Sequence, residues 1–365
     1  MAHQSHIEDL FLKHDGVMSF ERFMEEALYH PRFGYYSSNI ATVGRRGDFS
    51  TSVTISDVIA RAACVWALRE KKAILQAGMS RRWNVIEVGA GDGSFARDFI
   101  AQTPVMHRAL LSYHIVEKSA PLKRKQAETA PKSKIKWHED IGDALDASEG
   151  NALIIANELA DAFPARRLRY NANNRQWEEL FLRDMGHDGL TEFFKPIGGD
   201  VKAVDSTVTE DWDSEIQALE DGQLVETLTS YHEWLQSWAP KLKRGAFLTI
   251  DYGDAFPRLY AKRPKGTIRG YFQGVCAKDT EIYDRFGHQD LTTDVNFTDL
   301  LNWGSDLGFT NVSMQKQREF LATMLPELEQ PGPAQQDPAV EFLMSPYGAG
   351  DAFKDLWQRK TSSET

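Results

Sequence analysis

The sequence predicts an α/β fold built on a mostly parallel sheet with helices on both faces. From residue 83 onward, short apolar runs alternate with amphipathic stretches, and a glycine-rich turn follows the first run. The runs are WNVIEV, YHIVEK, KIKWHED, ALIIAN and AFLTIDY. Strands that alternate with helices in this way form βαβ units, whose strands lie parallel in one sheet.

Composition and charge exclude several classes of protein. The 365 residues suffice for about two domains, and 42% apolar with 26% charged residues is ordinary for a globular chain. A formal net charge of −11 repels phosphate backbones, so we expect no nucleic-acid partner. No apolar run approaches the roughly 20 residues that span a bilayer, and the N-terminus resembles neither a signal nor a transit peptide. We therefore expect a cytoplasmic protein without a membrane span; a homo-oligomer is compatible with the sequence.

The number and spacing of the cysteines predict free thiols and no cysteine-bound metal site. Cys64 and Cys276 are too few and too far apart for a disulfide framework or a local metal site. We expect two buried thiols and no metal.

The chain before the first strand combines a helix with a long loop. Residues 19–30 place apolar side chains along one helical stripe, with Ser19 as N-cap and Pro31 beyond the end. The glycine-, serine- and threonine-rich stretch that follows predicts a loop that enters a helix near Ser56.

About ninety residues separate ALIIAN from AFLTIDY, which is too many for one crossover. We predict a hairpin that turns at residues 171–174, and a helix with an apolar stripe from Leu224 to Trp238. The predicted parts of the chain are an N-terminal helical and lid region (1–80), a core (81–170 and 240–325), an insertion (171–239), a mobile Pro-rich loop (326–338) and a C-terminal strand and tail that complete the core (339–365).

The strongest local signal is EVGAGDGSF, in which an apolar strand runs into glycine at every second position. Gly89, Gly91 and Gly93 allow a tight turn and close approach of the backbone to a ligand, and the amides of the following helix point at the same place. A dinucleotide site requires G-x-G-x-x-G, whereas this loop is G-x-G-x-G after an acid at Glu87. That spacing is associated with S-adenosylmethionine.

Acidic residues end the next two predicted strands. Glu117 can accept hydrogen bonds from ribose hydroxyls, and Asp140 with Ile141 suits an adenine ring. A single acid at a strand end is as often a helix cap. Three acids at successive strand ends, Glu87, Glu117 and Asp140, together with a glycine loop favour a nucleoside-type cofactor.

The fourth strand ends in Asn157, Glu158 and Asp161, and the fifth in Asp251. Carboxyl ends of parallel strands form the usual ligand edge of an open α/β sheet. Methyl transfer requires a positioned acceptor, and carboxylates could fix the planar fork of a guanidinium. Structural alternatives stay open: Asp161 could be a cap, Glu158 could pair with a nearby arginine, and Asp251 could be a turn residue.

These segments resemble the MidA-type family of class I methyltransferases, whose mitochondrial members are complex I assembly factor arginine methyltransferases. The resemblance spans nearly the whole chain. The segments that carry it are ALYHPRFGYY, GDFSTS, EVGAGDGSF, VEKS…Q, ANELADAFP, FLTIDYG, GTIRGYF, GHQDLTTDVNF and LMSPYGAGDAFKDL. It implies a Rossmann-like fold with a seven-stranded, mostly parallel sheet, an N-terminal helical elaboration and an inserted substrate-side region.

The resemblance also implies roles for individual residues. Those expected to enclose the cofactor are Gly47, Asp48, Phe49 and Thr51. Those expected to bind it are Glu87, Gly89, Gly91, Gly93, Glu117, Asp140, Ile141 and Asn157. Asn157, Glu158 and Asp161 would face the methyl group and acceptor, with Asp251 as a further candidate. Tyr252, Asp290 and Thr292 match family positions of less certain role.

Three departures from the family pattern lie toward the substrate side. Val53 and Thr54 replace a proline and a carboxylate, Asn296 replaces an aspartate, and Gly274 stands where a histidine is common. These departures concern the specificity for the acceptor more than the binding of the cofactor.

The leading hypothesis is a methyltransferase that uses S-adenosylmethionine and methylates a protein arginine, with a respiratory-complex subunit as one candidate substrate. A small-molecule methyltransferase and a non-catalytic, cofactor-binding assembly factor are the alternatives. A cationic acceptor requires two or more carboxylates, whereas a neutral hydroxyl needs one base.

Overall fold

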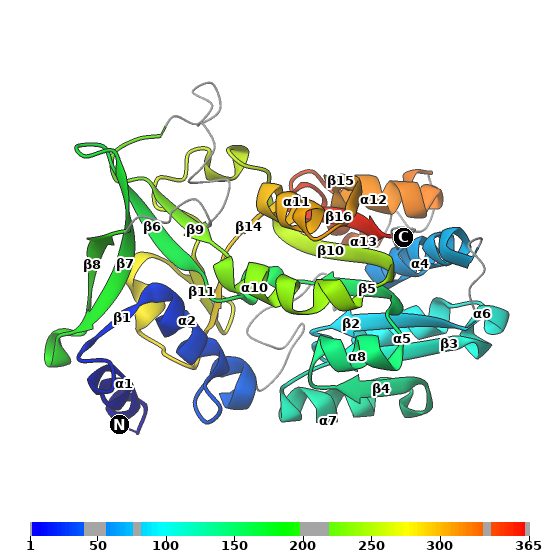
Figure 1. Ribbon diagram of the computed structural model, residues 1–365, viewed down its shortest axis with the longest axis horizontal. Helices are drawn as coiled ribbons and strands as arrows, with labels where there is room; N and C mark the ends of the chain where they lie inside the picture. Colours follow the sequence, from blue (N-terminus) through cyan, green and yellow to red (C-terminus); the bar gives the residue numbers. More distant parts are fainter. Residues whose placement is uncertain (1, 40–55, 76–81, 198–218, 331–336, 362–365) are drawn as a thin grey trace. The chain divides into compact units, whose positions relative to one another are not determined.

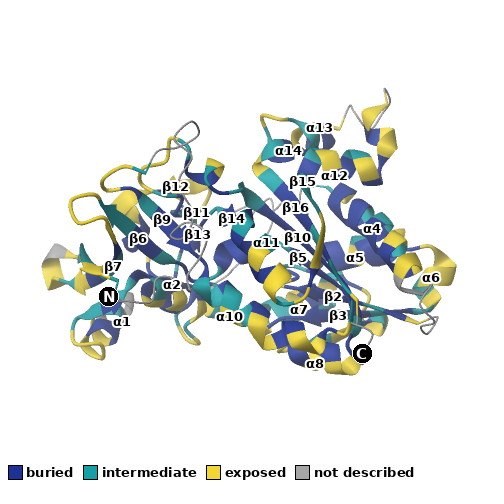
Figure 2. Cartoon of the chain, turned by 45° about the horizontal axis from the view of Figure 1, so that its top comes forward, coloured by how far each residue is buried: buried dark blue, intermediate teal, exposed yellow. Residues whose placement is uncertain are grey.

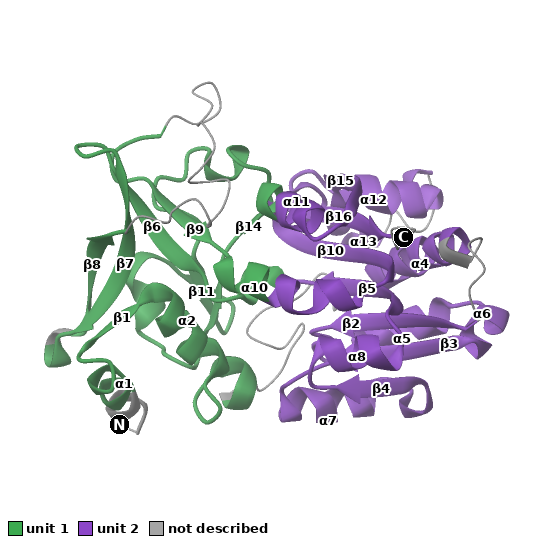
Figure 3. Ribbon diagram, in the orientation of Figure 1, with its two compact units in different colours: residues 1–41, 160–233, 254–299 green, residues 42–159, 234–253, 300–365 purple. Residues whose placement is uncertain are grey.

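The computed structural model describes residues 2–39, 56–75, 82–197, 219–330 and 337–361. The chain divides into two compact units (Figure 3). Unit 1 comprises residues 1–41, 160–233 and 254–299, and unit 2 comprises residues 42–159, 234–253 and 300–365. The predicted N-terminal region (1–80) is divided: residues 1–41 belong to unit 1 with residues 171–233 of the predicted insertion, whereas residues 42–80 belong to unit 2.

The main sheet of unit 2 contains seven strands in one continuous order, β15-β16-β10-β5-β2-β3-β4 (Figure 1). Their bounds are β2 (Trp83–Val88), β3 (Leu111–Val116), β4 (Ile135–His138), β5 (Asn151–Asn157), β10 (Arg244–Asp254), β15 (Thr310–Lys316) and β16 (Phe353–Lys360). Among the described residues, a further two-residue strand brings the sheet to eight, one more than the seven expected. Strand β16 lies antiparallel to both neighbours, and the pairs from β10 to β4 are parallel.

The order of strands reverses between β2 and β5. From β2 the chain proceeds to β3 and β4 on one side, whereas β5 leads to β10 on the other. Val88 is the Cα partner of Ala156, so the segments that follow β2 and β5 leave the sheet side by side. Open α/β sheets bind ligands at such a switch point.

Helices cover the sheet of unit 2. They are α4 (Val58–Leu75), α5 (Ser94–Gln102), α6 (Val105–Ala109), α7 (Ala120–Thr129), α8 (Ile141–Ala147), α12 (Gln317–Met324), α13 (Pro338–Met344) and α14 (Ala349–Ala352), with α10 (Thr229–Trp238) and α11 (Phe297–Asp306) divided between the units. One large apolar cluster joins α4, α5 and α12 to the central strands. Figure 2 shows these strands as buried, with exposed residues on the outer faces of the helices. None of the described helices is long and apolar enough to span a membrane.

Unit 1 contains two smaller antiparallel sheets beside its helices. Its helices are α1 (Ala2–Leu12) and α2 (Phe20–Tyr29), and a one-turn helix, η3, covers Ala160–Ala162. The first sheet holds β1 (Val17–Ser19), β6 (Arg166–Asn171), β7 (Gln176–Asp184), β8 (Leu190–Pro196) and β9 (Leu224–Thr227). The second sheet holds β11 (Arg269–Phe272), β12 (Val275–Ala277) and β13 (Asp290–Thr292); β14 (Val295–Asn296) follows in the chain.

Several local predictions are confirmed and two are wrong. Helix α2 has Ser19 as N-cap, and β6 and β7 form the predicted hairpin. The predicted helix from Leu224 begins only at Thr229, because residues 224–227 pair with β6 as strand β9. The apolar spacing is compatible with either element, and cross-strand pairing decides it. Cys64 is buried as expected, whereas Cys276 is exposed on β12.

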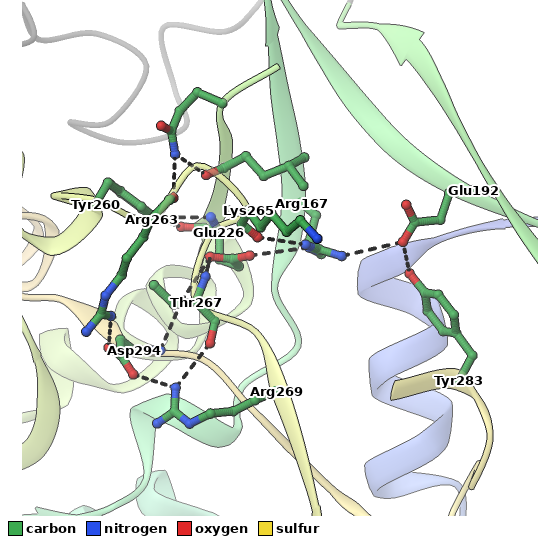
Figure 4. A network of polar contacts seen from close by, with 12 residues as sticks. Arg167, Glu192, Glu226, Tyr260, Arg263, Lys265, Thr267, Arg269, Tyr283 and Asp294 are labelled. Carbon is green, nitrogen blue, oxygen red and sulfur yellow. Dashed lines mark hydrogen bonds and ion pairs between the residues drawn. The ribbon is translucent and has the colours of Figure 1, made fainter. Parts of the chain in front are cut away.

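Unit 1 also holds a buried ionic network (Figure 4). Arg167 pairs with Glu226 at 3.3 Å, and Glu226 accepts hydrogen bonds from the backbone N–H and the hydroxyl of Thr267 at 2.7 and 2.9 Å. Arg269 donates to the Thr267 carbonyl at 3.1 Å and pairs with Asp294 at 2.6 Å. The network ties the GTIRGYF segment to strands β6 and β9.

Candidate active site

The glycine loop follows β2 directly, at the switch point of the sheet. Gly89, Gly91 and Gly93 have φ values of +71°, +53° and +84°, which a side chain rarely adopts. A Cβ on Gly89 would lie 2.9 Å from Leu159 Cδ1, and one on Gly93 would lie 3.0 Å from the Cα of Gln126. The loop therefore needs glycine for its dihedral angles and for close packing. It delivers the chain to the N-terminus of α5, where unpaired amides can face a ligand.

Glu117 lies beside this loop, just after β3. Its Oε1 accepts from the backbone N–H of Ser119 at 2.8 Å, and its Oε2 accepts from Gln126 Nε2 at 3.0 Å. Burial raises the pKa of this carboxyl, and these hydrogen bonds oppose the shift. Carboxylates in this position of a doubly wound sheet accept ribose hydroxyls.

Gln126 is a residue whose role sequence reasoning missed, although it belongs to the VEKS…Q pattern. It is fully buried, and its Nε2 also donates to the Gly91 carbonyl at 3.0 Å, while its Oε1 accepts from Trp137 Nε1 at 3.1 Å. One side chain thus connects the glycine loop, Glu117 and strand β4. Its spacing from Glu117 was the available signal.

Glu87 lies within the sheet, where Tyr113 of the neighbouring strand donates a hydrogen bond to it at 2.8 Å. Burial raises the pKa of Glu87 to about 8. The structure places Glu87 beneath the loop, against Tyr113.

Asp140 and Ile141 follow β4. Asp140 is exposed and serves as the N-cap of α8, accepting from the Gly142 N–H at 2.6 Å, while Ile141 is buried. Asp140 is thus a helix cap, which was the structural alternative to cofactor binding. A role of both residues at an adenine ring stays a prediction.

The carboxyl ends of β5 and β10 bring Asn157, Glu158 and Asp251 together. Asn157 Nδ2 donates to Glu158 Oε1 at 3.3 Å, and Glu158 takes a left-handed φ of +50° while its N–H donates to the Ile250 carbonyl. Asp251 is fully buried, and its two oxygens accept from the backbone N–H groups of Leu159 and Tyr252. Asp251 therefore fixes the turn that follows β5.

Two polar atoms at this edge suit a bound cofactor. Asn157 Oδ1 and Ser94 Oγ are buried and have no hydrogen-bond partner among the residues that the structure describes. Buried polar atoms are rarely left unpaired. Asn157 is the last residue of β5, and Ser94 is the first residue of α5 after the glycine loop, so a polar ligand above this loop would satisfy them. Sequence reasoning missed Ser94, although it is part of the EVGAGDGSF motif.

Asp161 belongs to unit 1, three residues after Glu158 in the chain. It is buried in η3, its Oδ2 accepts from the Thr292 hydroxyl at 2.9 Å, and its carbonyl accepts from the Thr293 N–H. Two arginines were considered as structural partners of Glu158. Arg166 donates to Glu179, and Arg167 donates to Glu226.

The remaining candidates divide into two groups. Gly47, Asp48, Phe49 and Thr51, with Val53 and Thr54, lie outside the described residues. Gly274 has a φ of +76° in the turn between β11 and β12. Asn296 is the residue before α11, and its Oδ1 accepts from the Thr298 N–H at 3.1 Å. Local backbone geometry thus accounts for glycine and asparagine at these positions.

Comparison with known proteins decides the family. Residues 63–314 match the profile of the family described as "Putative S-adenosyl-L-methionine-dependent methyltransferase". The chain belongs to this family. It is also similar to the mitochondrial protein arginine methyltransferase NDUFAF7 of Danio rerio, with 28% identity over 85% of this chain and 73% of the relative. The human protein of the same name is 26% identical over 94% of this chain and 80% of the relative.

Solved structures support the fold of this methyltransferase family member. A protein from Burkholderia thailandensis, crystallised with S-adenosyl-homocysteine, has a TM-score of 0.81 and 24% identity, over 98% of this chain and 92% of that chain. The chain thus shares the fold of that protein, and the description of the family names S-adenosyl-L-methionine as its cofactor. The glycine loop, Glu117, Ser94 and Asn157 provide donors and acceptors that fit it.

The relatives overturn one prediction. They are named as mitochondrial proteins, so the predicted cytoplasmic location is wrong. That prediction relied on the absence of a recognisable targeting segment, and an absence does not locate a protein.

Proposed function

We propose that the chain transfers a methyl group from S-adenosylmethionine to the guanidinium of an arginine in a protein substrate. The relatives named as protein arginine methyltransferases support this acceptor. The observation that carries the proposal is the carboxylate of Glu158, which lies at the carboxyl edge of the sheet beside Asn157, where a cationic side chain would be held by carboxylates. Asp161, three residues later in the chain, is proposed as a second carboxylate. A respiratory-complex subunit is the proposed substrate class.

The residues of unit 2 would hold the cofactor and those after β5 would hold the acceptor. S-adenosylmethionine supplies an electrophilic methyl group on a sulfonium. Glu117 would bind ribose hydroxyls, and the amides after the glycine loop would face the polar tail. Asn157 would contribute its buried Oδ1 at the same edge. Asp251 supports this arrangement by holding the turn at Leu159.

The acceptor nitrogen would attack in line with the S–CH₃ bond. The N–CH₃ bond forms as the S–CH₃ bond breaks, and the sulfur keeps the electron pair as a neutral thioether. The nitrogen releases one proton to solvent. Glu158 and Asp161 would orient the guanidinium so that one nitrogen lone pair points at the methyl carbon. Positioning of this kind supplies a large share of rate acceleration.

Transfer of a deuterated methyl group tests the proposal. The purified protein is incubated with methyl-deuterated S-adenosylmethionine and with proteins from mitochondria, and the label is located by tandem mass spectrometry. We expect the label on arginine side chains, and its loss with Asp161→Asn. Label on another residue type or on small molecules would contradict an arginine acceptor.

A further inference from the structure

A pair of phenylalanines lies on the more exposed face of the first sheet of unit 1. Phe181 of β7 and Phe193 of β8 are Cα partners, so their side chains leave the same face, and their ring centroids are 5.9 Å apart. Both residues are partly exposed. Leu180 and Leu182, which point to the opposite face, are fully buried. The phenylalanine pair therefore belongs to the outer face of this part of the sheet.

Two cationic side chains lie over these rings. Lys195 Nζ is 4.0 Å from the centroid of Phe181 and 5.4 Å from that of Phe193, and Arg183 Cζ is 4.8 Å from that of Phe193. Both cations are exposed, and neither forms an ion pair with a described residue. Glu179, the acid opposite Lys195, pairs instead with an arginine of β6 at 2.8 Å. The aromatic–cationic patch formed by these rings and cations comprises Phe181, Arg183, Phe193 and Lys195.

Strand β8 also offers an open edge. Among the described residues it pairs with β7 alone, and Figure 1 shows it at the border of this sheet. The N–H of Ile197, directly after β8, donates to the Trp177 carbonyl of β7 at 3.1 Å. Backbone groups of successive residues alternate in direction along a strand, so the odd-numbered residues of β8 bond to β7. The residues whose N–H and C=O groups point away from the sheet are Leu190, Glu192 and Phe194.

We propose that the aromatic–cationic patch and this edge bind an extended, acidic segment of a partner protein, which adds to the sheet as a strand beside β8. An added strand would lie about 4.8 Å from β8, exchange hydrogen bonds with its outward backbone groups, and place every second side chain on the face of the patch. Both cations lie over the ring of Phe193, on β8 itself. Carboxylates of the added strand would therefore reach them, while its apolar side chains would cover the ring. This inference does not depend on the proposed methyl transfer.

Charge and backbone chemistry favour this occupant over two others. The chain has a formal net charge of −11, so unpaired cations are a local feature of its surface and attract an acidic partner to one place. A single-stranded nucleic acid could stack on the rings, but it has no peptide groups for the edge of β8. A second copy of the chain would bring one positively charged patch against another, which is destabilising.

Fluorescence anisotropy with labelled eight-residue peptides tests the inference. The first peptide alternates glutamate with valine, the second has glutamine in place of glutamate, and the third has proline at two central positions, which removes backbone donors. A labelled oligothymidylate of eight nucleotides probes for nucleic acid. The variants are Lys195→Glu and Arg183→Glu, which reverse the exposed charges, and Lys195→Arg, which keeps the charge. Arg175→Glu is the matched control, because Arg175 is also exposed, in the turn between β6 and β7 of the same sheet.

We expect the glutamate peptide to bind, and the glutamine and proline peptides to bind at least about tenfold more weakly. Lys195→Glu and Arg183→Glu should each weaken binding of the glutamate peptide about tenfold, because an attraction becomes a repulsion. Lys195→Arg and Arg175→Glu should stay within about twofold. The binding should also weaken in about 1 M salt, which shortens the screening length to about 3 Å. Unchanged melting temperatures would report that the variants are folded.

Several results would overturn the inference. They are no binding of the glutamate peptide up to about 1 mM, equal binding of the glutamine or proline peptide, unchanged binding in both charge reversals, and a loss by Arg175→Glu as large as that by Lys195→Glu. Tighter binding of the oligothymidylate than of the glutamate peptide would assign the patch to nucleic acid. Sedimentation of the protein covers the last alternative: a dimer that competes with the peptide would assign the patch to a second copy and refute a separate partner.

Discussion

The two units are stabilised by different interactions. Unit 2 has one large apolar cluster that runs from helix α4 through the central strands to α14. In unit 1, the apolar cluster around Leu168 and Trp177 is smaller, and a buried ionic network centred on Glu226 lies beside it. Burial of apolar surface tolerates many sequences, whereas a buried ion pair depends on both partners. Unit 1 should therefore be the more sensitive to single polar substitutions.

The largest expected effect is a loss of stability caused by a substitution in unit 1. Glu226→Gln removes the charge opposite Arg167, whose side chain is only 4% exposed. Glu192 also pairs with Arg167, at 3.7 Å, and would still compensate part of its charge. Full loss of the partner of a buried charge costs about 3–5 kcal/mol, so the free energy of unfolding should fall by up to that amount in chemical denaturation. Asp279→Asn is the control, because its pair with Lys265 has side chains 58% and 75% exposed and should contribute less than about 1 kcal/mol. Equal losses from both variants would contradict the comparison.

The next effect is on unit 2 and on ligand binding. Gly91 has a φ of +53°, a conformation that a β-branched residue adopts only with strain of roughly 1–3 kcal/mol. Gly91→Val should therefore weaken calorimetric binding of S-adenosyl-homocysteine by about 10- to 100-fold. Gly222→Val places valine at a φ of +80° in a turn of unit 1 and should leave this binding unchanged. Comparable losses in both variants would mean that misfolding, not the loop, abolishes binding.

A smaller effect concerns pH. Asp355 is fully buried on β16, and neither carboxylate oxygen has a hydrogen-bond partner among the described parts of the chain. Burial raises its pKa well above the usual range. The unfolded chain loses this proton near pH 4 while the folded chain keeps it, so this group lowers the free energy of unfolding as pH rises above about 4.

Asp355→Asn removes that titration. We expect the variant to gain stability relative to the unaltered protein as pH rises, by up to about 1.4 kcal/mol per pH unit until Asp355 ionises in the folded state. Denaturation curves at pH 5 and pH 8 measure the difference. Asp306→Asn, at an exposed position of the same unit, is the control. If Asp355→Asn gained the same stability at both pH values, the result would contradict a raised pKa of Asp355.

The smallest effect tests a departure from the family pattern. Asn296 accepts from the Thr298 N–H at the start of α11 and donates to Asp299 at 2.8 Å. Asn296→Ala should lower the free energy of unfolding by about 1 kcal/mol, the usual value of an N-cap. Asn296→Ser retains a capping oxygen and should lose less. If Asn296→Ala instead abolished methyl transfer without a change in stability, Asn296 would contact the acceptor.

The difference between local signals and long-range pairing explains which elements could be predicted from the sequence. Strands β2, β3, β4, β5 and β10 and the glycine loop were predicted because apolar periodicity and glycine spacing are local signals, whereas β15 was not predicted. Strand β9 was mistaken for helix, because its identity depends on pairing with β6, about fifty-five residues earlier.

The contacts of the candidate site were harder to predict. Asp161 was identified from its place after a strand, but its partner Thr292 is 131 residues away. The sequence showed Gln126 only as the last residue of the VEKS…Q pattern, although its side chain hydrogen-bonds to both Gly91 and Glu117. Local rules name the chemical groups at a site, whereas long-range packing decides which groups meet.

One comparison tests most directly whether unit 2 binds the cofactor and Asp161 selects the acceptor. Asp161→Asn is measured by calorimetric titration with S-adenosyl-homocysteine and by transfer of a deuterated methyl group to arginine. We predict binding within about twofold of the unaltered protein and a loss of transfer of at least about 100-fold, as for other groups that position a reacting atom. Unchanged transfer, or loss of S-adenosyl-homocysteine binding together with transfer, would contradict this division of roles.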